Sequence, residues 1–138
     1  MRRLFALLLL LVAVPAAAQT DQPEWRQARE EQVLVRAGRI EPNPLRLEAG
    51  RPTRLVFHNG SSVRLSIDGY DFFASALVRP GDLHENENGR ISLAPGESRS
   101  VTLVPRVGRY RLGSGSWFRR LFGMRTRIIV EPPRSAER

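Results

Sequence analysis

The sequence predicts an all-β domain, built as a sandwich or barrel of about seven or eight strands. Short apolar runs alternate with polar residues at the period of two that is typical of half-buried strands. Eleven glycines and ten prolines punctuate the chain, mostly between these runs. No segment of useful length shows the 3.6-residue period of a helix. Many short strands with frequent turns indicate a sandwich or a barrel.

The predicted strands follow one another at short intervals. They centre on residues 33–35, 45–47, 54–58, 63–67, 91–93, 101–103, 110–112 and 126–130. In the fourth of these, Val63, Leu65 and Ile67 share a face, which predicts that Leu65 points into the domain. Residues 70–78 are expected to hold a short helical turn, and the polar, turn-rich residues 79–89 a surface loop.

The first residues predict export. Arg2 and Arg3 precede an apolar run at residues 4–14, and a small-residue cleavage signal follows at 16–18. We expect a signal peptide at 1–18, a flexible segment at 19–31, the domain at 32–131 and a disordered tail at 132–138. The protein is then periplasmic or secreted. An uncleaved membrane anchor is the less favoured alternative, because no second apolar run follows.

Composition excludes several kinds of site. The chain has no cysteine, so neither disulfides nor thiolate sites can form. All 22 basic residues are arginine and the formal net charge is +8, yet the arginines are spread along the whole chain. We interpret them mainly as a compositional bias. A nucleic-acid partner is not expected, whereas attraction to anionic surfaces stays open. No catalytic motif is present, so no enzymatic activity is expected.

The order of several motifs resembles the cupredoxin family of small blue-copper domains, a Greek-key sandwich of exported proteins. The resemblance covers about residues 33–131. It rests on five features in order: Asn59, Phe72-Phe73, the segment Ala94-Pro95-Gly96-Glu97-Ser98, Gly108-x-Tyr110 and Gly123-Met124.

The resemblance implies where copper ligands would stand. The family holds copper with two histidines, a cysteine and usually a methionine. Carried over by spacing, the first histidine falls on Leu65, the cysteine on Ser114, the second histidine on Arg119 and the methionine on Met124. Three of the four positions are therefore replaced. An arginine also repels a cation, so we expect no copper site and no cofactor.

The loop from Ser114 to Met124 has two interpretations. Its apolar side chains can plug the space of the lost metal. Alternatively, an exposed patch can dock a partner protein or an anionic headgroup. The candidate docking residues are Trp117, Phe118, Arg119, Arg120 and Phe122. A buried Arg119 would need a partner, for which Asp68 and Asp71 are candidates, although a turn alone explains these two aspartates.

The two histidines are weak candidates for metal ligands. His58 is expected on the strand face opposite Leu55 and Phe57, exposed or partly packed. His84 lies beside carboxylates in the polar loop, where loose metal binding is conceivable but a solvated loop is the preferred interpretation.

The sequence thus favours a cupredoxin-like domain with a degenerate copper site. Its expected role is that of a non-catalytic binding or accessory module, with an unknown periplasmic protein or an anionic surface as partner. The first alternative is a cupredoxin that handles copper, or transfers electrons, through an unorthodox site. The second is an arginine-rich protein that binds membrane or other anionic surfaces.

Overall fold

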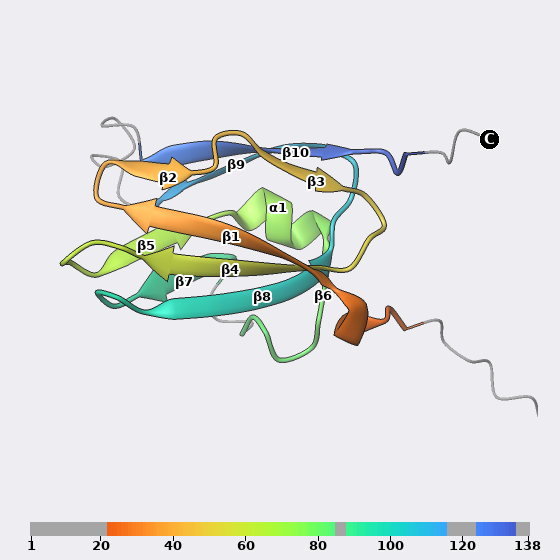
Figure 1. Ribbon diagram of the computed structural model, residues 1–138, viewed down its shortest axis with the longest axis horizontal. Helices are drawn as coiled ribbons and strands as arrows, with labels where there is room; N and C mark the ends of the chain where they lie inside the picture. Colours follow the sequence, from red (N-terminus) through yellow and green to blue (C-terminus); the bar gives the residue numbers. More distant parts are fainter. Residues whose placement is uncertain (1–21, 85–87, 116–123, 135–138) are drawn as a thin grey trace, which may run out of the picture.

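The computed structural model describes residues 22–84, 88–115 and 124–134, which form two facing β-sheets (Figure 1). Sheet A has the strand order β2-β1-β4-β8-β6, and sheet B has the order β3-β10-β9-β5-β7. The strands of sheet A are β1 (Arg29–Arg36), β2 (Arg39–Glu41), β4 (Thr53–Asn59), β6 (Leu77–Val78) and β8 (Ser98–Val104). Those of sheet B are β3 (Leu45–Glu48), β5 (Leu65–Asp68), β7 (Arg90–Leu93), β9 (Gly108–Ser114) and β10 (Arg125–Glu131).

The predicted β-sandwich is confirmed, but the predicted number of seven or eight strands is wrong. The described residues form ten strands. The two extra strands are β2, with three residues, and β6, with two. Such short strands cannot display an alternating pattern, and only their pairing with β1 and β8 reveals them.

The chain passes repeatedly from one sheet to the other. Among the described strands, β1 pairs in parallel with β4, and β10 pairs in parallel with β3. The other pairs are antiparallel, including β9 with β10 and β5 with β9. Parallel neighbours need crossover connections, so β1 reaches β4 through β2 and β3, and β3 reaches β10 through the strands between them.

The core lies between the sheets and follows the alternation of the strands. On β5, Leu65 and Ile67 are buried, which confirms the inward direction predicted for Leu65. Val63 does not share their face. It precedes β5 and is 43% exposed, because the chain is still turning between β4 and β5 at this point.

A short helix closes one side of the core, as expected for residues 70–78. Helix α1 (Tyr70–Ser75) buries Phe72 and Phe73. The backbone N–H of Tyr70 donates a hydrogen bond to Asp68 Oδ1 at 3.2 Å, and this bond holds the first turn of the helix. Gly69 precedes the helix, where a Cβ would lie only 2.7 Å from Leu112 Cδ1. A Cβ here would displace the Leu112 side chain where α1 approaches β9, which favours glycine.

Asn59, the first motif of the family resemblance, is fully buried and ties three segments together. Its Nδ2 lies 2.8 to 3.1 Å from the carbonyl oxygens of Val63, Leu93 and Ala94, and its Oδ1 accepts hydrogen bonds from Ser61. These bonds join the end of β4 to the loop before β5 and the end of β7. The structure therefore accounts for an asparagine at this position. Burying an amide group is costly unless it is hydrogen-bonded, and Asn59 makes these bonds.

The Gly108-x-Tyr110 motif also has a structural cause. The Tyr110 hydroxyl donates a hydrogen bond to the Arg106 carbonyl oxygen at 3.0 Å, and its ring packs against Phe72. A Cβ at Gly108 would lie 2.8 Å from this hydroxyl. Glycine at 108 therefore leaves room for the tyrosine ring, which anchors the start of β9 to the helix.

The first strand begins before residue 32, the start of the domain predicted from the sequence. A 3-10 helix, η1, spans Trp25–Gln27, and β1 starts at Arg29, within the segment 19–31 that was expected to be flexible. The backbone of Arg29 donates to the Pro52 carbonyl oxygen, and the strand then pairs with β4. The described residues contain no helix that is long and apolar enough to span a membrane.

Candidate functional site

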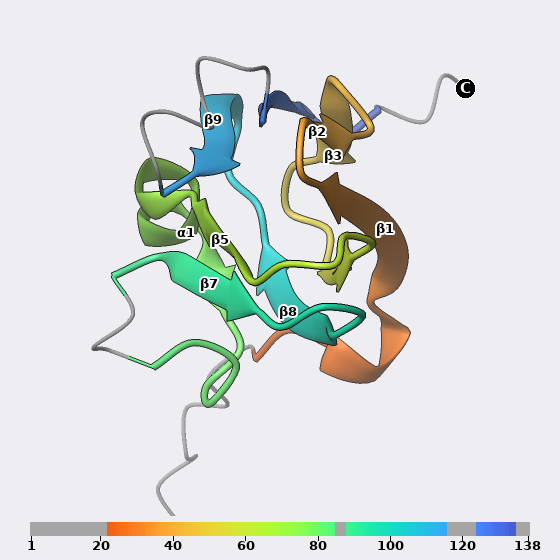
Figure 2. The same cartoon turned by 90° about the vertical axis from the view of Figure 1, so that its left-hand side faces the viewer.

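Three of the four positions that the resemblance assigns to copper ligands come together at one end of sheet B. Ser114 is the last residue of β9, and its backbone N–H donates to the Met124 carbonyl oxygen at 3.0 Å. On the other side, Ser114 is the cross-strand partner of Ile67, two residues from Leu65 on β5. Figure 2 looks onto this end and shows β5 between β9 and β7.

All three side chains point into the core at this end. Leu65 and Ser114 are each 1% exposed, and Met124 is fully buried. Diagonal neighbours on one face of a sheet have Cα atoms about 7–8 Å apart, close enough for side chains to interact. The arrangement therefore brings together an aliphatic side chain, a hydroxyl and a thioether.

This donor set does not fit a blue-copper centre. Leu65 has no donor atom, a serine hydroxyl is not a thiolate, and one thioether is a weak ligand for copper. The chain has no cysteine that could supply the missing thiolate. Within the described ranges, no group of three or more histidines and carboxylates is placed to hold a metal ion.

The two histidines lie apart from these positions. His58 is half-buried on β4, on the opposite side of the strand from the buried Phe57, as the alternation predicted. Its Nδ1 makes a 2.7 Å hydrogen bond with Ser98 Oγ on β8. His84 is exposed. It follows a turn in which Arg79 forms an ion pair with Asp82 at 2.9 Å.

The docking surface predicted from the sequence lies outside the described residues. Trp117, Phe118, Arg119, Arg120 and Phe122 all belong to the segment 116–123. Of the two candidate partners of Arg119, Asp68 faces Arg90 across the β5–β7 pair, with 3.7 Å between oxygen and nitrogen. Asp71 is exposed on α1.

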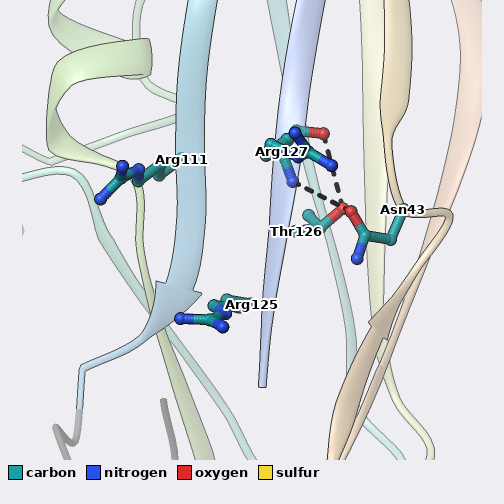
Figure 3. Close-up of a pocket in the computed structure, with 5 residues that line it drawn as sticks. All are labelled: Asn43, Arg111, Arg125, Thr126 and Arg127. Carbon is teal, nitrogen blue, oxygen red and sulfur yellow. Dashed lines mark hydrogen bonds between the residues drawn. The ribbon is translucent and has the colours of Figure 1, made fainter. Parts of the chain in front are cut away.

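A different group of residues lies on the outer, solvent-facing side of β9 and β10. Four exposed arginines alternate with inward-facing residues on β9 and β10, and we call them the basic face: Arg109, Arg111, Arg125 and Arg127. Arg111 and Arg127 are direct cross-strand partners. Beside them, a hollow of about 370 Å³ is lined by Asn43, Thr126 and three of these arginines (Figure 3).

Two hydrogen bonds fix the wall of this hollow. Thr126 Oγ1 donates to the Pro42 carbonyl oxygen at 2.7 Å, and the backbone N–H of Arg127 donates to Asn43 Oδ1 at 3.3 Å. Both hold the β2–β3 connection against β10. The sequence interpretation missed this site because it weighed the arginines along the chain as a whole. The repeated pattern Arg-x-Arg at 109–111 and 125–127 was the available signal.

Comparisons with known proteins identify the fold but no close relative. No protein-family model matches the chain, and no curated protein matches it. Among solved structures, a reduced auracyanin from Roseiflexus castenholzii matches 76% of this chain and 98% of its own, at 16% identity and a TM-score of 0.55. Auracyanin B matches 76% of this chain and 90% of its own, at 24% identity and a TM-score of 0.52.

A multicopper oxidase from Campylobacter jejuni matches 82% of this chain, at 10% identity and a TM-score of 0.57. The match covers only 31% of that longer protein. At these identities the similarity establishes architecture alone. The two five-stranded sheets and these structural neighbours confirm the fold expected from the motifs, and the chain is a cupredoxin-fold domain that lacks the cysteine and histidine ligands of copper.

Proposed function

We propose that this protein is a copper-free binding module, without catalytic activity, that works in the periplasm or outside the cell. One observation carries the proposal: the end of sheet B at which Leu65, Ser114 and Met124 meet is buried and built from side chains that cannot form a blue-copper centre. The signal-like N-terminus supports the location.

The fold can persist without a metal because hydrogen bonds and apolar packing stabilise this end of sheet B. Asn59 joins the end of β4 to the loop before β5 and to the end of β7. Leu65 and Met124 fill the interior with apolar volume. A cupredoxin sandwich closed in this way is a stable scaffold whose surfaces remain available for binding.

Copper titration of the purified protein tests the proposal. We expect no stoichiometric copper binding by calorimetry and no copper-dependent rise in the melting temperature, because the donor set is inadequate. Saturable binding of one copper ion per chain, of any colour, would overturn the proposal in favour of an unorthodox copper site.

The assignment of positions has its own test. The variant Leu65→His, Ser114→Cys, Arg119→His restores the family's ligands beside Met124, and we expect it to bind copper with an intense blue thiolate absorption band. The matched control replaces Ser114→Cys by Ser114→Ala and should lack the band. A variant that is folded by circular dichroism but does not bind copper would show that the positions are wrongly assigned.

A further inference from the structure

Among the described residues, the charges of the basic face lack the carboxylate partners that the arginines on other strands of sheet B have. On the same outer surface of sheet B, Arg46 pairs with Glu131 at 2.7 Å and Arg90 pairs with Asp68. In contrast, the guanidinium groups of the four basic-face arginines make no hydrogen bond or ion pair with other described residues. The positive charge there is not neutralised within the described part of the chain.

The register makes this arrangement costly to the fold. Arg111 and Arg127 are directly opposite, so their Cβ atoms are about 4.5–5.5 Å apart, and like charges in this relation are destabilising. Arg125 is the diagonal neighbour of Arg111, and Arg109 is the diagonal neighbour of Arg127. An anion placed between the guanidinium groups would remove the repulsion and turn the cluster into a binding site.

The hollow indicates the size and chemistry of the anion. The hollow has a volume of about 370 Å³, which leaves room for a compact anion. Arg111, Arg125 and Arg127 line this space, and the Nδ2 of Asn43 adds a donor that makes no hydrogen bond to other described residues. Several closely spaced negative charges in one compact molecule fit this site better than the single charge of a carboxylate.

A lipid surface fits the same site less well. Binding in the plane of a membrane needs apolar side chains that enter the lipid as well as basic groups. The large exposed apolar side chains of the described residues are Val63, Tyr70, Leu77 and Val107. None of them belongs to β9 or β10, so the described residues of this face offer charge and concavity without an apolar anchor.

We propose that the basic face, with Asn43, is a binding site for a small phosphate-bearing polyanion. The inference deepens the function proposed above, since it names the ligand class of a binding module, but it does not depend on the loss of copper. Arg111, Arg125 and Arg127 hold the phosphoryl oxygens through bidentate hydrogen bonds, and Asn43 closes the site from the β2–β3 connection. Arg109 adds long-range attraction.

The test is titration of the purified protein with inorganic tripolyphosphate, by calorimetry and by NMR of the arginine Nε–H groups. Saturable binding is expected, with shifts at Arg111, Arg125 and Arg127. The variant Arg111→Gln, Arg125→Gln, Arg127→Gln should bind at least about tenfold more weakly, since it loses several charge-assisted bonds. A control variant, Arg26→Gln, Arg36→Gln, Arg106→Gln, has the same net charge as this triple variant. It should bind tripolyphosphate like the unmodified protein.

Three results would overturn the proposal. The first is no saturable binding of tripolyphosphate by the unmodified protein. The second is an equal loss in both variants, because net charge alone would then explain binding. The third is tighter binding to vesicles of phosphatidylglycerol or to a poly-glutamate peptide at the same salt concentration, which would identify a lipid surface or an acidic protein as the ligand. A copper-binding result would leave each of these outcomes unaffected.

Discussion

Strands β9 and β10 present two faces with opposite character. Toward the core they place Leu112, Ser114 and Thr126, and Met124 is buried just before β10 begins. Toward solvent they place the four arginines of the basic face, all exposed. The resemblance to a copper family directs attention to the inner face, where the replaced ligand positions have become packed interior. The charge lies on the outer face, where no described residue pairs with the four arginines.

This contrast separates two kinds of residue in one hairpin. Residues on the inner face are determined by packing, so their substitution should lower stability without altering binding of polyanions. Residues on the outer face are not needed for packing, so their substitution should alter binding and leave the fold intact or improve it.

The largest effect is expected from truncation of side chains buried on the core side of sheet B, one on the neighbouring strand β5 and one just before β10. Leu65→Ala and Met124→Ala each remove a buried side chain and should lower the free energy of unfolding by about 2–5 kcal/mol. Urea unfolding followed by circular dichroism measures the change. Arg111→Ala is the matched outer-face control and should change stability by no more than about 0.5 kcal/mol. If Arg111→Ala lowered the free energy of unfolding as much as Leu65→Ala or Met124→Ala, the two faces would not differ in their contribution to stability.

A smaller loss is expected where β9 is anchored to its preceding turn. Tyr110→Phe keeps the ring against Phe72 but removes the hydroxyl that donates to the Arg106 carbonyl oxygen. We expect a loss of about 0.5–1.5 kcal/mol in unfolding free energy, the usual net value of such a hydrogen bond. If Tyr110→Phe unfolds at the same urea concentration as the unmodified protein, the hydroxyl contributes no stability.

A gain in stability is expected at the outer face. Arg127→Glu places a carboxylate directly opposite Arg111 and replaces repulsion with attraction. The free energy of unfolding should rise by about 0.2–1 kcal/mol, while tripolyphosphate binding falls. Arg127→Gln separates the two contributions, because it removes the repulsion without adding the attraction. A loss of stability in both variants would mean that Arg127 supports the fold.

The smallest effect is expected from salt. Raising sodium chloride to about 0.5 M screens the repulsion on the basic face, so the melting temperature of the unmodified protein should rise slightly. The rise should be smaller in Arg127→Glu, in which the cross-strand repulsion is absent. Melting curves at low and high salt for both proteins measure the difference, and an identical salt response would argue against local repulsion.

Much of the fold was predictable from the sequence because alternation and turn residues are local signals. They identified the sandwich, the inward direction of Leu65 and the short helix near Tyr70. The strand number was underestimated because β2 and β6 form only by pairing with longer neighbours. Local patterns cannot reveal a two-residue strand, since nothing in so few residues repeats.

The sequence by itself determined that this cupredoxin-fold chain has no thiolate for a blue-copper centre, since a missing cysteine cannot be supplied by folding. It also determined which residues of β9 and β10 face the core, because side chains alternate along a strand. Only the tertiary structure decided that Arg111 is opposite Arg127, with Asn43 beside them. Those contacts depend on the register of β9 against β10 and on the β2–β3 connection, both of which join residues distant in the chain.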